Sequence, residues 1–87
     1  MTIIDQVDAA VHSRVRDIFR HELELDVHPT VDVIDEGILD SMGFVRLLAE
    51  LERVFGVTIR VAELDLEDFR TMERVVRFVQ ARQAGVE

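Results

Sequence analysis

The sequence predicts an all-α fold: a small antiparallel bundle of three principal helices and one short helix, with a long ordered loop between the first two principal helices. Three stretches, residues 3–23, 41–55 and 71–84, carry apolar residues at helical spacing. The one strand-like stretch, residues 57–61, has no second strand to pair with, so we expect an extended loop there. At this length the chain has room for one core, and residues 1–87 form a single domain.

The first predicted helix covers residues 3–23. Its apolar side chains recur every three or four residues: Ile4, Val7, Val11, Val15 and Ile18. At its start, Thr2 followed three residues later by Asp5 resembles a capping box. This stretch is therefore predicted to be an amphipathic helix with one face in the core.

Residues 24–39 are predicted to form a long loop, because Pro29 breaks any helix and its neighbours lack a helical period. A flexible linker would be polar, whereas this loop contains six apolar side chains: Val27, Val31, Val33, Ile34, Ile38 and Leu39. Some of these must pack onto the helices, so we expect the loop to be ordered.

The clearest helical pattern lies in residues 41–55. At about 100° per residue, one face carries Phe44, Leu47, Leu48, Leu51, Val54 and Phe55. The opposite face carries Met42, Arg46, Ala49, Glu50 and Arg53, with Val45 on a flank. Asp40 or Ser41 is expected to cap the start, and Gly56 to adopt the left-handed conformation at the end.

The remaining residues predict one short helical turn and one longer helix. The short turn is expected between Ala62 and Phe69. Thr71 is expected to cap the last helix, which runs to about Ala84 and is ended by Gly85. Its inward side chains are predicted to be Met72, Val75, Val76 and Val79, with Phe78 at the margin.

Composition excludes several classes of function. A net charge of −8, from 18 acidic and 10 basic residues, argues against nucleic acid as a partner and favours partners with basic docking surfaces. The chain has no cysteine, which excludes disulfides and thiolate metal sites. No segment approaches the roughly 18 consecutive apolar residues of a membrane span. The start of the chain lacks the basic residues of a signal peptide, so the cytoplasm is the expected location. A monomer is the default expectation for the oligomeric state.

The most informative feature is Asp40-Ser41-Met42 at the start of the second predicted helix. A helix N-terminus presents backbone N–H groups without intrahelical partners, and these suit the charge of a phosphate ester. The simplest interpretation is a helix cap, but two residues are available for that role. Asp40 can satisfy the N–H groups while Ser41 Oγ stays free for modification. Met42 and Val45, both predicted to lie outside the core, indicate a docking surface beside the serine.

The spacing around Ser41 resembles the carrier-protein family, the acyl, peptidyl and D-alanyl carriers that bear 4′-phosphopantetheine on a serine. The family signature is Asp-Ser-Leu/Met at the start of the second helix and Phe-Gly at its end. Here it reads Gly37-Ile38-Leu39-Asp40-Ser41-Met42, then Leu47, Leu51 and Phe55-Gly56-Val57. The resemblance covers most of the chain, from the first amphipathic helix to the last.

The resemblance implies a discrete carrier without catalytic residues of its own. A phosphopantetheinyl transferase would attach the cofactor to Ser41, with Asp40 assisting that enzyme. The arm would hold an acyl or aminoacyl group as a thioester and shuttle it between partner enzymes in a specialised biosynthetic pathway. These partners would be an adenylating or acyl-loading ligase and a downstream acyl-transfer or condensing enzyme. The expected partner-binding residues are Met42, Val45, Arg46, Ala49 and Arg53.

Some residues favour particular carriers within the family. Fatty-acid carriers usually show acidic residues along the exposed face of the second helix, whereas Arg46 and Arg53 make this face mixed. The chain looks closer to D-alanyl and other stand-alone aminoacyl carriers in the following segments: Leu39-Asp40-Ser41-Met42-Gly43, Glu63-Leu64, Glu67-Asp68-Phe69 and Thr71. It departs from D-alanyl carriers at Phe69 and Met72, where Trp and Pro are expected. The absence of a linker before Met1 favours a free-standing protein.

The acidic residues between positions 32 and 40 invite comparison with a calcium-binding loop. Counting from Asp32 places Gly37 at position 6, as such a loop requires. It also places Ile34 and Gly43 at positions 3 and 12, where oxygen ligands are needed. The pattern therefore favours a solvated acidic loop over a calcium site.

The competing interpretation is an unmodified interaction module, an acidic helical bundle that binds a partner protein through the Met42/Val45 surface. It predicts no covalent modification of Ser41. An enzyme is not expected, because the sequence contains no recognisable set of nucleophile, base and metal ligands. His12, His21 and His28 lack metal-ligand spacing and are interpreted as surface residues.

Overall fold

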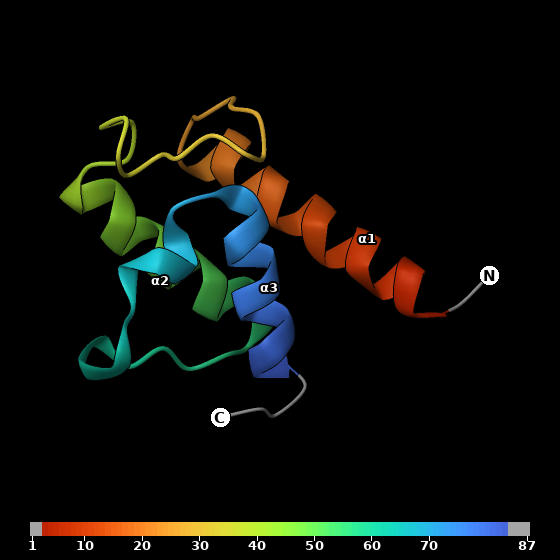
Figure 1. Ribbon diagram of the computed structural model, residues 1–87. Helices are drawn as coiled ribbons and strands as arrows, with labels where there is room; N and C mark the ends of the chain where they lie inside the picture. The colour runs from red at the N-terminus through yellow and green to blue at the C-terminus, as the bar shows by residue number, and fades with distance from the viewer. Residues whose placement is uncertain (1–2, 84–87) are drawn as a thin grey trace.

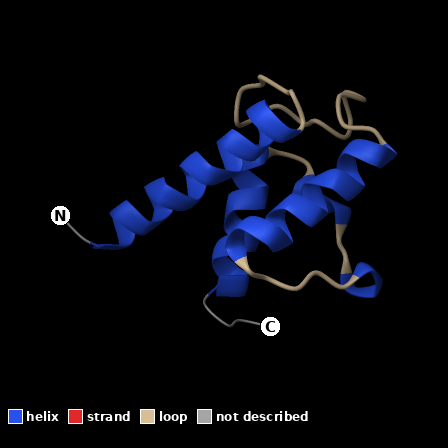
Figure 2. Ribbon diagram, turned by 180° about the vertical axis from the view of Figure 1, so that it is seen from behind, coloured by secondary structure: helices blue, strands red, loops and turns tan. Residues whose placement is uncertain are grey.

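The computed structural model describes the backbone of residues 3–83 and the side chains of residues 9–83. Within that range all regular structure is helical, as predicted. The three main helices are α1 (Ile3–Asp17), α2 (Ser41–Phe55) and α3 (Met72–Gln83). The N-terminal part of α1 projects beyond the other two helices, as both views show (Figures 1 and 2). No helix in the described range is long and apolar enough to cross a membrane.

The core brings together apolar side chains from all three helices, the long loop and the segment before α3. The buried members are Val11, Val15, Ile18, Phe19, Val33, Leu39, Leu47, Leu51, Phe69, Met72, Val75, Val76 and Val79. The inward faces predicted for α2 and α3 are confirmed, and Phe78 is half-buried at the margin. The side chains of Ile4 and Val7, the capping residue Thr2, and the expected helix end at Ala84 and Gly85 lie outside the described residues.

The end of the first helix differs from the prediction. Regular α-helix stops at Asp17, and Ile18–Glu22 form a π-helical turn, η1. The wider turn is closed by the Leu23 N–H, which donates to the Ile18 carbonyl at 3.0 Å. Ile18 and Phe19, the first two residues of this turn, are both buried. The chain then bends at Glu24, whose φ of 57° lies in the left-handed region.

The long loop is ordered, as predicted, because its backbone is hydrogen-bonded both within the loop and to Arg70, just before α3. The Val33 N–H donates to the Arg70 carbonyl at 2.8 Å, and the Leu39 N–H donates to the Val33 carbonyl at 2.9 Å. Both Val33 and Leu39 are buried. Ile38 is an exception among the apolar loop residues, since it is 37% exposed.

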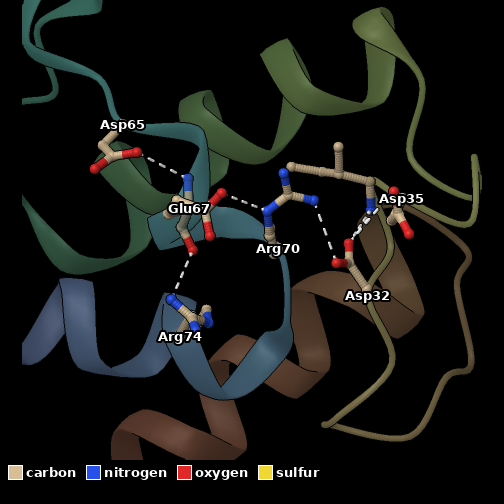
Figure 3. A network of polar contacts seen from close by, with 7 residues as sticks. Asp32, Asp35, Asp65, Glu67, Arg70 and Arg74 are labelled. Atoms are coloured by element: carbon tan, nitrogen blue, oxygen red, sulfur yellow. Dashed lines mark hydrogen bonds and ion pairs between the residues drawn. The ribbon is translucent and has the colours of Figure 1, made fainter.

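A polar network anchors this loop to the start of α3 (Figure 3). Asp32 Oδ1 accepts the Asp35 N–H at 2.8 Å, and Asp32 Oδ2 lies 3.3 Å from Arg70 Nη1. Arg70 Nε in turn donates to Glu67 Oε2 at 2.7 Å. The Asp35 N–H and the Arg70 guanidinium outweigh partial burial and hold the pKa of the Asp32 carboxyl below its ordinary value.

Between α2 and α3 the structure contains two short 3-10 turns where one short helix was predicted. Gly56 ends α2 with a φ of 68°, in the expected left-handed conformation. The turns are η2 (Val61–Glu63) and η3 (Leu66–Phe69). They are separate because Leu64 and Asp65 are extended, and the Asp65 side chain caps η3 by accepting the Glu67 N–H. Residues 57–60 form no strand.

The Asp32 interactions predict a pH-dependent contribution to stability. A pKa lowered by folding means that ionised Asp32 stabilises the fold above its ordinary pKa of 3.8 and that this stabilisation is lost as pH falls through the folded-state pKa. We expect Asp32→Asn to lower Tm at pH 7, and the difference from wild type to vanish in acid. Thermal unfolding followed by circular dichroism from pH 7 to pH 2.5 measures this.

Asp35→Asn is the matched control, because the Asp35 carboxylate makes no hydrogen bond or ion pair within the described residues. An equal loss of Tm in both variants would contradict a specific contribution from Asp32.

Candidate functional site

Asp40 caps the start of α2. The sequence left open whether Asp40 or Ser41 would do so. Its backbone is extended, with φ −85° and ψ −176°. Asp40 Oδ1 accepts the Gly43 N–H at 2.8 Å, and the Asp40 carbonyl accepts the Phe44 N–H at 2.8 Å. Ser41 is consequently the first residue of the helix rather than its cap.

Ser41 is exposed, and its Oγ makes no hydrogen bond with any described residue. The backbone N–H groups of Ser41 and Met42 likewise have no acceptor within the described part of the chain. A phosphoryl group on this oxygen would break no existing hydrogen bond. It would also lie at the positive end of the α2 dipole, which favours a phosphate charge by about 0.3–1 kcal/mol. The local geometry therefore fits a phosphodiester.

Gly43 permits the close packing of this first turn. A Cβ built at Gly43 would lie 2.9 Å from Leu39 Cδ1 and 3.2 Å from Asp40 Oδ1. The missing side chain thus leaves room for a buried leucine and for the capping carboxylate at the same time. This role of Gly43 cannot be predicted from sequence, because it depends on where Leu39 packs.

Exposed apolar side chains surround the serine. Met42 is 81% exposed and Val45, one turn further along α2, is 65% exposed, as the helical phase predicted. The structure adds Ile38 and Leu66, which are 37% and 51% exposed. Leu66 belongs to η3, and it lines a cavity of about 180 Å³ together with Ser41. Sequence spacing alone could not place Leu66 beside Ser41, since the two are far apart in the chain.

The predicted partner-binding residues share the exposed side of α2. Arg46, Ala49 and Arg53 are all exposed. Arg53 donates to Glu50 Oε1 through Nη2 at 2.5 Å and through Nε at 3.0 Å, and this pairing raises the pKa of Arg53. Arg46 makes no hydrogen bond or ion pair with a described residue. The face is therefore mixed in charge, and Arg46 is available to a partner or ligand.

The other sites considered from sequence are not assembled. Asp32, at the centre of the acidic loop, is bonded within the loop and to Arg70. His12, His21 and His28 lie on α1, η1 and the loop, and no group of three or more potential ligands in the described range could hold a metal ion. A larger cavity of about 750 Å³ lies beside Gly56 and Arg82. It is at the far end of α2, about 21 Å from Ser41 along the helix axis.

Comparison with known proteins identifies the family to which the chain belongs. The family model described as "Phosphopantetheine attachment site" matches residues 13–79, more than half of the chain and including the Ser41 region. The chain belongs to the phosphopantetheine-attachment family. Its cofactor is covalently attached 4′-phosphopantetheine, and it is a carrier protein of a family without catalytic activity of its own.

Several relatives of this carrier are D-alanyl carrier proteins. D-alanyl carrier protein 2 of Lactiplantibacillus plantarum is 35% identical over 81 residues, which cover 93% of this chain and 99% of that protein. The D-alanyl carrier protein of Abiotrophia defectiva is 34% identical over 70 residues, covering 80% of this chain and 81% of that one. The protein of the same name from Streptococcus suis is 44% identical over 45 residues, or 52% and 57% of the two chains.

The division of roles between Asp40 and Ser41 predicts different effects on stability. Asp40→Ala should lower the free energy of unfolding by about 1 kcal/mol, because it leaves the Gly43 N–H without its acceptor. Ser41→Ala should change it by less than about 0.5 kcal/mol, because it removes no hydrogen bond made to a described residue. Urea unfolding of the unmodified protein measures both, and Asp40→Asn serves as a variant that keeps an acceptor. Equal destabilisation by the two alanine substitutions would show that Ser41 shares the cap.

Proposed function

We propose that this carrier bears its phosphopantetheine on Ser41 and shuttles a thioester-bound aminoacyl group, D-alanine or a similar small amino acid, between partner enzymes. The observation that carries the proposal is the exposed Ser41 Oγ, which makes no hydrogen bond to a described residue and lies at a helix N-terminus that Asp40 already caps. The chain's other serine, Ser13, lies on α1, and its Oγ accepts a hydrogen bond from Arg16 at 3.5 Å.

The D-alanyl carriers among the relatives support an aminoacyl cargo. The departures at Phe69 and Met72 do not weaken this inference, because both side chains are buried, at 0% and 1% exposure. The two departures therefore lie inside the bundle, outside the exposed surface around Ser41. The mixed charge of the α2 face also separates this chain from the acidic face usual in fatty-acid carriers.

Attachment is a transfer from coenzyme A catalysed by a separate transferase with Mg²⁺. A bond forms between Ser41 Oγ and the phosphorus of the arm, the pyrophosphate link of coenzyme A breaks, and adenosine 3′,5′-bisphosphate leaves. The serine proton passes to a base of the transferase. When attached, the arm supplies the thiol that holds the acyl group. The chain's own contribution is an accessible Oγ beside the Ser41 and Met42 N–H groups, which have no acceptor among the described residues.

The exposed face of α2 is the proposed contact surface for the transferase, an adenylating or acyl-loading ligase and the downstream acyl-transfer enzyme. Met42 and Val45 offer apolar area next to Ser41, and Arg46 offers an unpaired positive charge. Ala49 and Arg53 extend the same face toward the C-terminal end of the helix. Small exposed apolar patches of this kind, rimmed by charge, are typical of transient interfaces.

The first test is intact-mass spectrometry after incubation with coenzyme A, Mg²⁺ and a broad-specificity phosphopantetheinyl transferase. We expect the wild-type protein to gain the mass of one phosphopantetheine arm. Ser41→Ala should gain nothing, while Ser13→Ala, the matched control, should be modified fully. Modification of Ser41→Ala would overturn the assignment of Ser41. A folded wild-type protein that several transferases fail to modify would favour the unmodified interaction module.

A second test addresses the docking surface. We expect Met42→Ala to lower kcat/KM of the transferase reaction about tenfold, equivalent to ~1.4 kcal/mol of transition-state binding. Tm should be nearly unchanged, because the Met42 side chain is 81% exposed. Val61→Ala is the control, since Val61 is 77% exposed but lies on η2. A large loss of Tm in Met42→Ala, or an equal loss of kcat/KM in Val61→Ala, would contradict this role.

A further inference from the structure

We propose that the cavity between η1 and the first turn of α2 binds the aminoacyl end of the arm. This inference rests on the proposed function and assigns a ligand to a site on the protein itself. The cavity has a volume of about 320 Å³, and its lining includes Glu22, Glu24, Leu25, Ile38, Met42 and Arg46. We refer to it as the η1–α2 cavity.

The cavity exists because of the unusual end of the first helix. The π-helical turn and the left-handed Glu24 fold residues 22–25 back toward α2. This conformation is fixed by the Leu25 N–H, which donates to the Phe19 carbonyl at 2.7 Å. The opposite wall comes from Met42 and Arg46, on the first turns of α2. Both walls are therefore set by backbone structure rather than by mobile side chains alone.

The position of the cavity suits a tethered ligand. Its lining includes Asp40 and Met42, the two neighbours of Ser41 in the chain. A group joined to Ser41 Oγ through a flexible arm is held at high effective concentration beside this opening, so weak contacts suffice for binding. The volume of about 320 Å³ is at the small end of the ~300–1,000 Å³ typical of ligand pockets. It has ample room for a small aminoacyl group, so the charges of its lining rather than its size decide which ligand it suits.

The charges around the cavity match an aminoacyl thioester. On the η1 side are the carboxylates of Glu22 and Glu24, and on the α2 side is the guanidinium of Arg46. The carboxylate of Asp40 also lines the cavity, but its Oδ1 already accepts the Gly43 N–H. Glu24 and Arg46 make no hydrogen bond or ion pair with a described residue, so both can bind a ligand. The ammonium group of the amino acid would face the carboxylates and its carbonyl oxygen would accept from Arg46. A small side chain would rest on Leu25 and Ile38.

Two other cavities fit this ligand less well. The cavity of about 180 Å³ on the η3 side of Ser41 is lined by Ile34, Phe44 and Leu66, with Asp40 as its one charged residue. Since Asp40 Oδ1 already accepts the Gly43 N–H, that cavity suits an apolar group rather than an ammonium. The cavity beside Gly56 is at the opposite end of α2 and presents Arg60 and Arg82 against the single acid Glu63.

The test compares two arms loaded onto ¹⁵N-labelled protein by the transferase. One arm ends in D-alanine joined through an amide in place of the thioester, which prevents hydrolysis. The other ends in propionate joined in the same way, which has similar size but no amine. Intact mass first establishes that each arm is attached. Backbone amide shifts are then recorded for Leu23 and Leu25 at the η1–α2 cavity, and for Phe44 and Leu66 on the other side of Ser41.

We expect the alanyl arm to shift the Leu23 and Leu25 amides more than the propionyl arm does. Glu24→Gln should remove most of this difference and lower the pKa of the alanyl amine by about half a unit, as expected for one exposed ion pair. Glu36→Gln is the control, because Glu36 is also an exposed loop carboxylate but does not line the cavity.

Each contrary result has a distinct meaning. Equal shifts from the two arms, or shifts concentrated at Phe44 and Leu66, would overturn the proposed site while leaving Ser41 as the attachment residue. An unchanged amine pKa in Glu24→Gln would overturn the role of that carboxylate. Failure of either arm to attach, detected by mass before any spectrum is recorded, would overturn the proposed function and this inference with it.

Discussion

The hydrogen bond from the Gly43 N–H to Asp40 Oδ1 is the interaction on which the site depends. It fixes where α2 begins and makes Ser41 the first helical residue, with its hydroxyl group free. The bond brings the carboxylate close to the helix, and the absence of a side chain at Gly43 leaves that space open. The buried Leu39 occupies the rest of the same space. A cap, a glycine and a core residue therefore determine together how the serine is presented.

This local arrangement is connected to the rest of the fold through the long loop. The Leu39 N–H donates a hydrogen bond to the Val33 carbonyl, and the Val33 N–H donates in turn to the carbonyl of Arg70, just before α3. The Arg70 side chain closes the same connection through Asp32 (Figure 3). A chain of short contacts thus runs from the start of α3 to the start of α2. The loop is ordered because its backbone groups have partners, and its apolar residues alone would not fix its path.

Features that depend on residues close in sequence were predicted well, whereas contacts between distant segments were not predicted. The bounds of α2 follow from local patterns, a cap at Asp40, a helical period and Gly56, so sequence and structure agree on residues 41–55. The π-helical turn was missed because apolar residues at Ile18 and Phe19 are compatible with either kind of helix. Leu66 could not be placed beside Ser41, because their proximity depends on how η3 packs against α2. The η1–α2 cavity was missed for the same reason, since its two walls come from different helices.

The separation of capping from modification at Asp40 and Ser41 has a practical consequence for monitoring this carrier. Because attachment at Ser41 Oγ displaces no hydrogen bond of the described fold, the apo and holo forms should differ in stability by no more than the interaction of one phosphate with the helix dipole, about 1 kcal/mol or less. For a domain this small such a difference shifts Tm by at most several degrees, so a melting curve does not give the fraction of a mixed preparation that carries the cofactor. Batches of this protein need to be assessed by a property of the prosthetic group, such as its mass or its thiol, because conformational stability carries little information about occupancy.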